Sequence, residues 1–184
     1  MGKVRIALLG LGTVGQGVWS ILSTNKDEIL RKCGCEIEVA KILVRNPDKS
    51  RGVKVPEGII TTDVNDILDD SSIKIVIELM GGTEPAKDYM LRAMRRKKHV
   101  VTANKLLLAT QGEELFNTAE QERVLFYYEA SVGGGIPIIR EINESLTANR
   151  IDKLVGIING TTNYILTKMT REGMDFNEAL KEAQ

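Results

Sequence analysis

The stretch Lys3-Val-Arg-Ile-Ala-Leu-Leu-Gly-Leu-Gly-Thr-Val-Gly15 decides the fold of this chain. It opens with a strand-like apolar run and continues into the pattern G-x-G-x-x-G, formed by Gly10, Gly12 and Gly15. In a strand–turn–helix unit, the first glycine permits a tight turn, the second lets the backbone approach a pyrophosphate, and the third lets the helix pack closely. The N–H groups at the helix N-terminus favour phosphates. The stretch therefore predicts a dinucleotide site, against the alternative of a glycine-rich turn without a ligand.

Apolar runs alternate with helical patterns over residues 1–134. We expect strands at residues 4–9, 36–44, 58–62, 73–80, 99–101 and 124–128, and helices at residues 13–32, 64–68, 85–98 and 105–121. This alternation is typical of an α/β fold, a Rossmann-type doubly wound parallel sheet. Ligands of such sheets bind beyond the carboxyl ends of the strands. The residues that directly follow a strand are therefore the candidates for function.

The residues after the second expected strand bear on the choice of cofactor. NAD-specific sites hold the ribose 2′-hydroxyl with an acidic residue here, but in this chain Arg45 follows the strand. Because a guanidinium can pair with a 2′-phosphate, Arg45 favours NADP, with NAD as the alternative. Lys54 on the following loop is expected to assist, while Asp48 is a rival that would reach a hydroxyl instead. If none of them binds a ligand, they are ordinary surface charges.

Two further strand ends carry unusual residues. Gly81 and Gly82 follow the strand at 73–80, where they either let a nicotinamide ribose approach the backbone or form a plain turn. Lys105 opens the helix after the strand at 99–101, which is an unfavourable place for a cation. This placement favours a functional lysine that donates to a carboxylate or carbonyl oxygen of a substrate, against the alternative of a solvent-facing lysine that opens a helix.

The glycine-rich run at 132–136 lies beyond the last expected strand of the sheet. Its backbone carbonyls are ligands that a hard monovalent or divalent cation accepts. Equally, the run is a flexible connection to a helix that starts with Pro137. From residue 135 onward we expect a second domain, with a helix at 138–146, a strand at 154–158, a helix after 163 and another from 175. No stop signal precedes the chain end, so we expect this domain to be incomplete.

Composition excludes several classes of function. Lysine plus arginine number 25, as do aspartate plus glutamate, so the formal net charge is zero and gives no reason to expect nucleic acid or a membrane as partner. No apolar run approaches the ~18 residues of a membrane span. The basic stretch 92–98 is interpreted as the solvated last turn of a helix. Cys33 and Cys35, with one histidine, cannot make a four-ligand zinc site and are expected to be free thiols of a cytoplasmic protein.

Several ordered motifs over the whole chain resemble those of homoserine dehydrogenases. They are the glycine fingerprint at 10–15, Glu-Leu-Met-Gly-Gly at 78–82, Val-Thr-Ala-Asn-Lys at 101–105, Glu-Ala-Ser-Val-Gly-Gly-Gly-Ile-Pro at 129–137, and Gly-Ile-Ile-Asn-Gly-Thr-Thr-Asn-Tyr-Ile at 156–165. The last motif is the most specific, because generic dehydrogenases of this fold do not carry it. It argues against another oxidoreductase that acts on a small acid.

The resemblance implies NAD(P)-dependent interconversion of L-aspartate 4-semialdehyde and L-homoserine, a step toward threonine, methionine and isoleucine. It implies that cofactor contacts are made by Leu11, Thr13, Val14, Arg45 and Lys105. It also implies that a sodium-type ion is bound by oxygens of Glu129, Val132, Gly134 and Ile136.

In the resembled family, the second domain binds the substrate and forms the dimer. The domains expected here are therefore an NAD(P)-binding domain at 1–134 and the start of an α+β substrate and dimerisation domain at 135–184. The family's substrate acids and catalytic Asp and Lys lie further along than Gln184, so a truncated, inactive enzyme is expected. Among the residues present, Lys105 and the hydroxyls of Thr161 and Thr162 are the candidate proton donors. The alternative is an NADP-binding module without catalysis.

Overall fold

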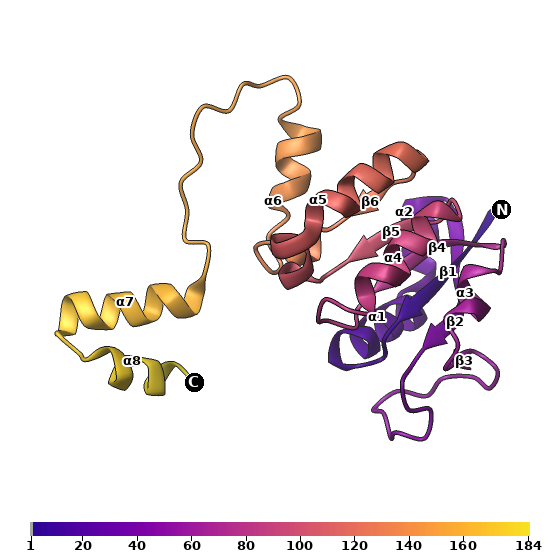
Figure 1. Cartoon of the computed structure of the whole chain (residues 1–184), viewed down its shortest axis with the longest axis horizontal. Helices are drawn as coiled ribbons and strands as arrows, with labels where there is room; N and C mark the ends of the chain where they lie inside the picture. The colour runs from indigo at the N-terminus through magenta and orange to yellow at the C-terminus, as the bar shows by residue number, and fades with distance from the viewer. Residues whose placement is uncertain (1) are drawn as a thin grey trace. The chain divides into compact units, whose positions relative to one another are not determined.

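The structure is a computed structural model that describes residues 2–184, and it divides into two compact units, one ending at Val132 and one spanning residues 133–184 (Figure 1). The first unit contains a six-stranded sheet with the strand order β3-β2-β1-β4-β5-β6, and all of its pairings are parallel. Its strands are β1 (Gly2–Leu9), β2 (Cys35–Leu43), β3 (Ile60–Thr61), β4 (Ile73–Glu78), β5 (His99–Thr102) and β6 (Phe126–Tyr127). This order confirms the predicted doubly wound sheet.

Helices cover both faces of the sheet (Figure 1). They are α1 (Thr13–Thr24), α2 (Lys26–Cys33), α3 (Asn65–Leu68), α4 (Ala86–Arg95) and α5 (Lys105–Glu122), and a 3₁₀ turn, η1 (Glu129–Ser131), follows β6. One apolar cluster joins α1 to Ile6 and Leu8 of β1, and the other joins α3, α4 and α5 to Ala7 and Leu9. β1 is therefore buried on both faces, which explains its continuous apolar run. Full burial of a side chain such as Leu8 contributes roughly 1.5–3 kcal/mol.

The parallel register places the carboxyl ends of the strands at one edge of the sheet. Leu9 of β1 lies opposite Leu43 of β2 and opposite Glu78 of β4. Glu78 in turn lies opposite Thr102 of β5, and the neighbouring pairing joins β5 to Tyr127 of β6. The residues that follow these five strands therefore meet along the same edge, as the sequence predicts for the first unit.

The single helix expected at 13–32 is wrong, because two helices occupy this stretch. α1 ends at Thr24, and Asn25 has the non-helical angles φ −105° and ψ 25° before α2 begins. The Thr24 hydroxyl donates to the Ser20 carbonyl at 2.8 Å. Ser, Thr and Asn side chains compete in this way with helical backbone hydrogen bonds, which favours a break where they cluster.

Residues 133–184 form the second unit. It contains α6 (Ile138–Arg140), a π-helical turn η2 (Glu141–Ser145), α7 (Gly160–Glu172) and α8 (Phe176–Ala183). α7 and α8 pack against each other, with Ile165 and Ala179 buried and with Lys168 of α7 ion-paired to Glu182 of α8 at 3.6 Å. The extent of each domain, predicted at 1–134 and 135–184, stays a prediction.

The strand expected at 154–158 is wrong. This stretch has no regular secondary structure, and Figure 1 shows it as an extended trace between η2 and α7. Its four large apolar side chains are all exposed, with Ile158 83% exposed. A strand needs a neighbour for its N–H and C=O groups, and no strand occurs elsewhere in residues 133–184. Apolar β-branched residues alone therefore do not make a strand here.

The basic stretch 92–98 is not solvated throughout, which corrects its interpretation. Lys98 is only 2% exposed, and its ammonium donates to the carbonyls of Asp70 at 2.6 Å and Ile73 at 3.0 Å. Burial lowers the pKa of this ammonium. Lys98 thus stabilises the loop between Asp70 and Ile73 that leads into β4. Arg95 to Lys97, at the end of α4, are exposed.

Asp70 organises the same loop through its carboxylate. This group accepts hydrogen bonds from the hydroxyl and the backbone N–H of Ser72, and it forms an ion pair with Arg5 of β1 at 3.2 Å. The Ser72 hydroxyl, followed by the Ser72 N–H and Arg5, holds the pKa of Asp70 below its ordinary value. Because the folded-state pKa is the lower one, the stabilisation is complete above the ordinary aspartate pKa of about 3.9 and is lost as the pH falls through the folded-state value.

We expect Asp70→Asn to lower the free energy of unfolding by about 1 kcal/mol at about pH 7. The variant should also lose less stability than the parent below about pH 4, since it no longer titrates here. Urea unfolding at both pH values measures this. Asp69→Asn is the control, because Asp69 is 62% exposed in its ion pair with Arg96 and such pairs contribute little. Equal losses in the two variants near neutral pH would contradict the role of Asp70.

Two findings bear on the expectations from composition. Within residues 2–184, no helix combines the length and the apolar character that crossing a membrane requires. Cys33 and Cys35 are both free, with Cys33 exposed and Cys35 half-buried.

Candidate functional site

The glycine fingerprint lies at the strand-end edge of the sheet. Gly10 follows β1 with a φ of +108°, a conformation that favours glycine. Its N–H donates to the Leu43 carbonyl of β2 at 2.9 Å. A Cβ atom on Gly10 would lie 2.9 Å from the Leu79 carbonyl oxygen beyond β4, closer than such atoms approach. The turn is therefore fixed between the ends of β2 and β4 by a residue without a side chain.

Gly12 has open space around it, whereas Gly15 is closely packed. Gly12 is the N-cap of α1, no side chain caps this helix, and a Cβ on Gly12 would meet no atom within 4 Å. A Cβ on Gly15 would instead collide with the Gly10 carbonyl oxygen, so α1 packs directly on the turn. The open space at Gly12, beside free N–H groups, fits the pyrophosphate of a dinucleotide.

A cleft of about 190 Å³ adjoins the fingerprint. Val14, which is exposed like Thr13 in the first turn of α1, lines one side of this cleft. Residues 78–81 after β4 and residues 103–104 after β5 line the rest. Leu11 is buried beneath α1 and belongs to the apolar cluster, so it offers a ligand its backbone. The cleft lies where the strand order reverses between β1 and β4, which is where doubly wound sheets bind ligands.

Glu78 forms the floor of this region. Its side chain is fully buried, and one carboxylate oxygen accepts hydrogen bonds from the backbone N–H groups of Met80 at 2.7 Å and Gly81 at 3.2 Å. The other oxygen accepts from the Thr102 hydroxyl at 2.6 Å. The carboxylate therefore joins the loop after β4 to the end of β5.

Asn104 makes the second connection between these loops. Its backbone N–H donates to the Thr102 hydroxyl oxygen at 3.1 Å, and its side-chain amide donates to the Gly82 carbonyl at 2.6 Å. Its side-chain oxygen accepts from the Leu107 N–H at 3.2 Å and thereby caps α5. One asparagine thus sets both the start of α5 and the position of the glycine pair.

The predicted residues Gly81, Gly82 and Lys105 gather around these connections. Gly81 and Gly82 have φ values of +72° and +74°, and a Cβ on either would meet no atom within 4 Å. Lys105 is the first residue of α5, directly after Asn104, and is exposed. The structure therefore brings these three residues to one side of the fingerprint, at the ends of β4 and β5.

Arg45 lies on the opposite side of the fingerprint, directly after Val44 and the end of β2. It is exposed, and its guanidinium has no hydrogen bond or ion pair within residues 2–184. Arg51 stabilises the loop that follows. Its guanidinium donates hydrogen bonds to the carbonyls of Asn46 at 2.7 Å, Lys49 at 2.8 Å and Pro47 at 3.2 Å. Arg45 thus starts a loop with a defined shape.

Two side chains of α1 hold the far end of this loop. The Gln16 side-chain oxygen accepts a hydrogen bond from the Gly52 N–H at 2.7 Å, and the Trp19 indole N–H donates to the Lys54 carbonyl at 3.1 Å. Lys54 itself is exposed, as is the rival Asp48. The loop at 45–54 is therefore attached to the helix whose N-terminus carries the fingerprint.

The four residues predicted to bind a cation fall in both units. Glu129 and Val132 belong to the first unit, where Glu129 begins η1, and Gly134 and Ile136 belong to the second. No group of three or more His, Cys, Asp or Glu side chains could hold a metal ion within residues 2–184.

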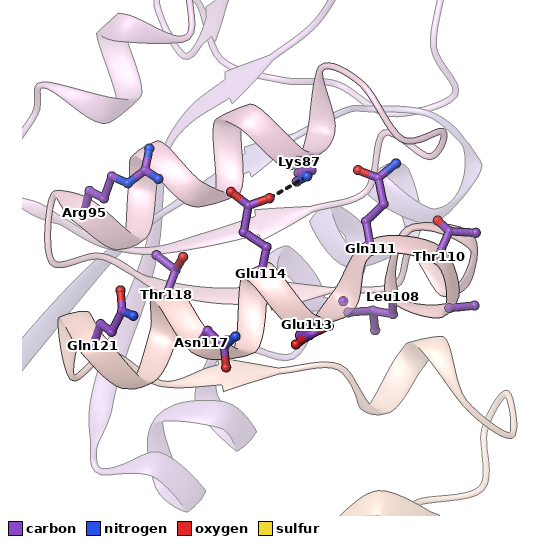
Figure 2. A pocket seen from close by; sticks show the side chains of 12 residues that line it. Lys87, Arg95, Leu108, Thr110, Gln111, Glu113, Glu114, Asn117, Thr118 and Gln121 are labelled. Carbon is purple, nitrogen blue, oxygen red and sulfur yellow. Dashed lines mark ion pairs between the residues drawn. The ribbon is translucent and has the colours of Figure 1, made fainter.

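A larger hollow, of about 740 Å³, runs along α4 and α5 (Figure 2). Most of its lining side chains are polar, and the ion pair between Lys87 and Glu114, 2.6 Å long, lies within it. Gln111 interrupts α5 here with a φ of −144°. None of the predicted site residues lines this hollow. We take the smaller cleft as the candidate site, because it adjoins the open helix N-terminus at the strand ends.

Comparison with known proteins identifies the family. A family model described as "Homoserine dehydrogenase, NAD binding domain" matches residues 10–129. The chain belongs to the homoserine dehydrogenase family. A second model, described as "Homoserine dehydrogenase", matches residues 137–184, so both parts of the chain are similar to proteins of this family.

Individual homoserine dehydrogenases are similar over the full chain. That of Bacillus subtilis is 48% identical over 184 residues, which are 100% of this chain and 42% of that protein. The crystal structure of a homoserine dehydrogenase from Thiobacillus denitrificans matches with a TM-score of 0.88 and 49% identity, over 100% of this chain and 42% of that one. A hyperthermophilic archaeal homoserine dehydrogenase in complex with NADPH matches with a TM-score of 0.77 and 25% identity, over 98% of this chain and 60% of that one. The chain spans about two-fifths of the length of the curated relatives it matches.

Three residues to which the sequence analysis gave no role shape the loops around the candidate site of this homoserine dehydrogenase family member. Gln16 and Arg51 shape the loop after β2, and Glu78 shapes the loop after β4. A signal for Glu78 was available, since it is a charged residue at the end of a strongly apolar strand. For Gln16 and Arg51 no pattern in the sequence distinguishes them from other polar surface residues.

Proposed function

We propose that the chain binds a nicotinamide dinucleotide at the strand-end edge, with NADP preferred and NAD as the alternative. The observation that carries the proposal is the uncapped N-terminus of α1, with open space at Gly12 and a cleft beside it. Residues 10–15 would hold the pyrophosphate, Arg45 and Lys54 the 2′-phosphate, and Gly81, Gly82 and Lys105 the nicotinamide half. The archaeal relative in complex with NADPH supports this choice of cofactor.

We further propose homoserine dehydrogenase activity for the protein, the interconversion of L-aspartate 4-semialdehyde and L-homoserine in threonine, methionine and isoleucine biosynthesis. The bound cofactor would supply or accept the hydride. Lys105 would donate a hydrogen bond to a carboxylate or carbonyl oxygen of this small-molecule substrate. Thr161 and Thr162, in the first turn of α7, are the other candidate donors. Family membership supports these roles.

A sodium-type ion at Glu129, Val132, Gly134 and Ile136 is part of the same proposal, and the oxygen-rich donor set supports it. We also propose that the protein is a cytoplasmic homodimer or higher oligomer, with no nucleic-acid or membrane partner. The free Cys33 and Cys35 support a reducing compartment.

Gly12→Val tests the dinucleotide site. We expect this variant to bind NADPH at least about tenfold more weakly than the parent chain, because the side chain would fill the space of the pyrophosphate. Its fold should persist, since no atom lies within 4 Å of the new Cβ. Calorimetric titration with NADPH and NADH measures binding, and thermal unfolding measures the fold.

Gly17→Val is the matched control for this experiment. Gly17 is exposed on the same helix, and a Cβ there also meets no atom within 4 Å, so NADPH binding should stay at the parental level. A parent chain that binds neither NADPH nor NADH would contradict the proposal. The same conclusion would follow if Gly12→Val bound NADPH as tightly as the parent.

A further inference from the structure

Glu78 is a buried carboxylate whose charge has no cationic partner. Its side chain is 0% exposed, and its three hydrogen-bond donors are the neutral N–H groups of Met80 and Gly81 and the hydroxyl of Thr102. Within residues 2–184, no lysine or arginine forms an ion pair with it. Buried carboxylates are usually paired with a cation, because an unpaired charge is costly to remove from water. The position of Glu78 therefore calls for a reason beyond packing.

The charge of Glu78 acts on the cleft beside the fingerprint. Glu78 lines this cleft together with the apolar Val14 and the backbone of Gly81, and no other ionisable side chain lines it in the part of the chain that the structure describes. In such a partly desolvated space, the field of a carboxylate is screened less than in water. A ligand group that enters the cleft is thus exposed to the field of this carboxylate, since Lys105 at the start of α5 does not line the cleft.

The fold determines which part of a dinucleotide enters the cleft. The fingerprint after β1 holds the pyrophosphate, and the adenosine ribose extends toward the end of β2, where Arg45 lies. The nicotinamide half then extends to the other side, toward the ends of β4 and β5 and so into the cleft. This step rests on the proposed dinucleotide site.

We infer that Glu78 biases the site toward the oxidised form of the cofactor. The oxidised nicotinamide ring carries a positive charge that the reduced ring lacks, so the carboxylate at the floor of the cleft attracts only the oxidised ring. Attraction between unit charges a few ångströms apart in a partly buried site is sufficient for a roughly fivefold difference in Kd. Glu78 is thus a specificity-determining residue for the redox state, besides holding the loop at 79–82.

Calorimetric titration of the chain with NADP⁺ and NADPH tests this inference. Glu78→Gln keeps the shape of the side chain and one oxygen acceptor but removes the charge. We expect it to bind NADP⁺ about fivefold more weakly than the parent and NADPH within about twofold of the parent. Glu84→Gln is the matched control, because Glu84 is exposed and does not line the cleft, and it should leave both affinities within about twofold.

The outcomes separate the inference from the proposed function. Equal weakening of NADP⁺ and NADPH binding by Glu78→Gln would overturn the inference, since a purely structural role affects both forms, and so would unchanged affinities. If circular dichroism shows that Glu78→Gln does not fold, Thr102→Val replaces it in the titrations. This variant removes the hydroxyl that donates to the Glu78 carboxylate but leaves the charge of the site unchanged. A ratio of the two Kd values within about twofold of the parental ratio then supports the inference, and a larger change overturns it. A parent chain that binds neither form overturns the dinucleotide site itself.

Discussion

Gly15→Ala is expected to lower the melting temperature of the first unit by about 10 °C, which corresponds to a loss of about 3 kcal/mol. The added methyl group would collide with the Gly10 carbonyl oxygen. The turn has little room to move, because the Gly10 N–H donates to the Leu43 carbonyl of β2 and a Cβ on Gly10 would already lie 2.9 Å from the Leu79 carbonyl oxygen. Either α1 moves away from the sheet or the turn breaks its contacts with both neighbouring strands. Thermal unfolding followed by circular dichroism measures the loss.

Gly17→Ala is the control for this variant. It makes the same chemical change two residues further along α1, at an exposed position where no atom lies within 4 Å. Because alanine favours a helix interior over glycine, this variant should be as stable as the parent or more stable by up to about 1 kcal/mol. If Gly15→Ala unfolded at the parental temperature, the close packing of α1 on the fingerprint turn would not be a determinant of stability.

Arg45→Ala is expected to weaken NADPH binding by about 1.5–3 kcal/mol, roughly a tenfold to hundredfold rise in Kd, with little effect on NADH. A guanidinium bonded to a phosphate is a charge-assisted pair, and NADH lacks that phosphate. The loop after Arg45 is already shaped by Arg51 and attached to α1 by Gln16, so little ordering is needed on binding. Titration with both cofactors measures the selectivity.

Lys49→Ala provides the control for Arg45→Ala. Lys49 is an exposed cation in the same loop, so its loss changes the net charge equally without removing the residue at the strand end. We expect NADPH binding within about twofold of the parent. Equal losses for NADPH and NADH in Arg45→Ala would contradict the 2′-phosphate assignment and leave Asp48, which would reach the ribose hydroxyl, as the candidate. Similar losses in the two variants would indicate general attraction of an anion by the loop.

Gly15→Ala and Arg45→Ala address different properties of the candidate site. The Gly15 variant tests how closely α1 packs on the fingerprint turn, and therefore whether the uncapped helix N-terminus at Gly12 forms. The Arg45 variant tests the proposal that this residue selects NADP over NAD. A stable Arg45→Ala chain with altered selectivity, beside an unstable Gly15→Ala chain, would separate the scaffold from its specificity.

The sequence alone determined the sheet and its functional edge. The apolar run of β1, the G-x-G-x-x-G spacing and the alternation of strand and helix patterns are local features, and they predicted the doubly wound sheet that the structure contains. Parallel strands place their carboxyl ends together, so the gathering of Gly10, Arg45, Gly81 and Lys105 along one edge followed from the order of elements.

Tertiary structure decided what local pattern could not. The stretch at 154–158 is apolar and β-branched, yet it is not a strand, because a strand exists only with a neighbour to pair with. The partners that shape the site are distant in sequence: Glu78 and Thr102 are 24 residues apart, Trp19 and Lys54 are 35 apart, and Gln16 and Gly52 are 36 apart. The sequence could predict a dinucleotide site at this edge because helix and strand periodicity are local. Only the folded chain decided which side chains hold the surrounding loops, because that depends on which distant residues the sheet brings into contact.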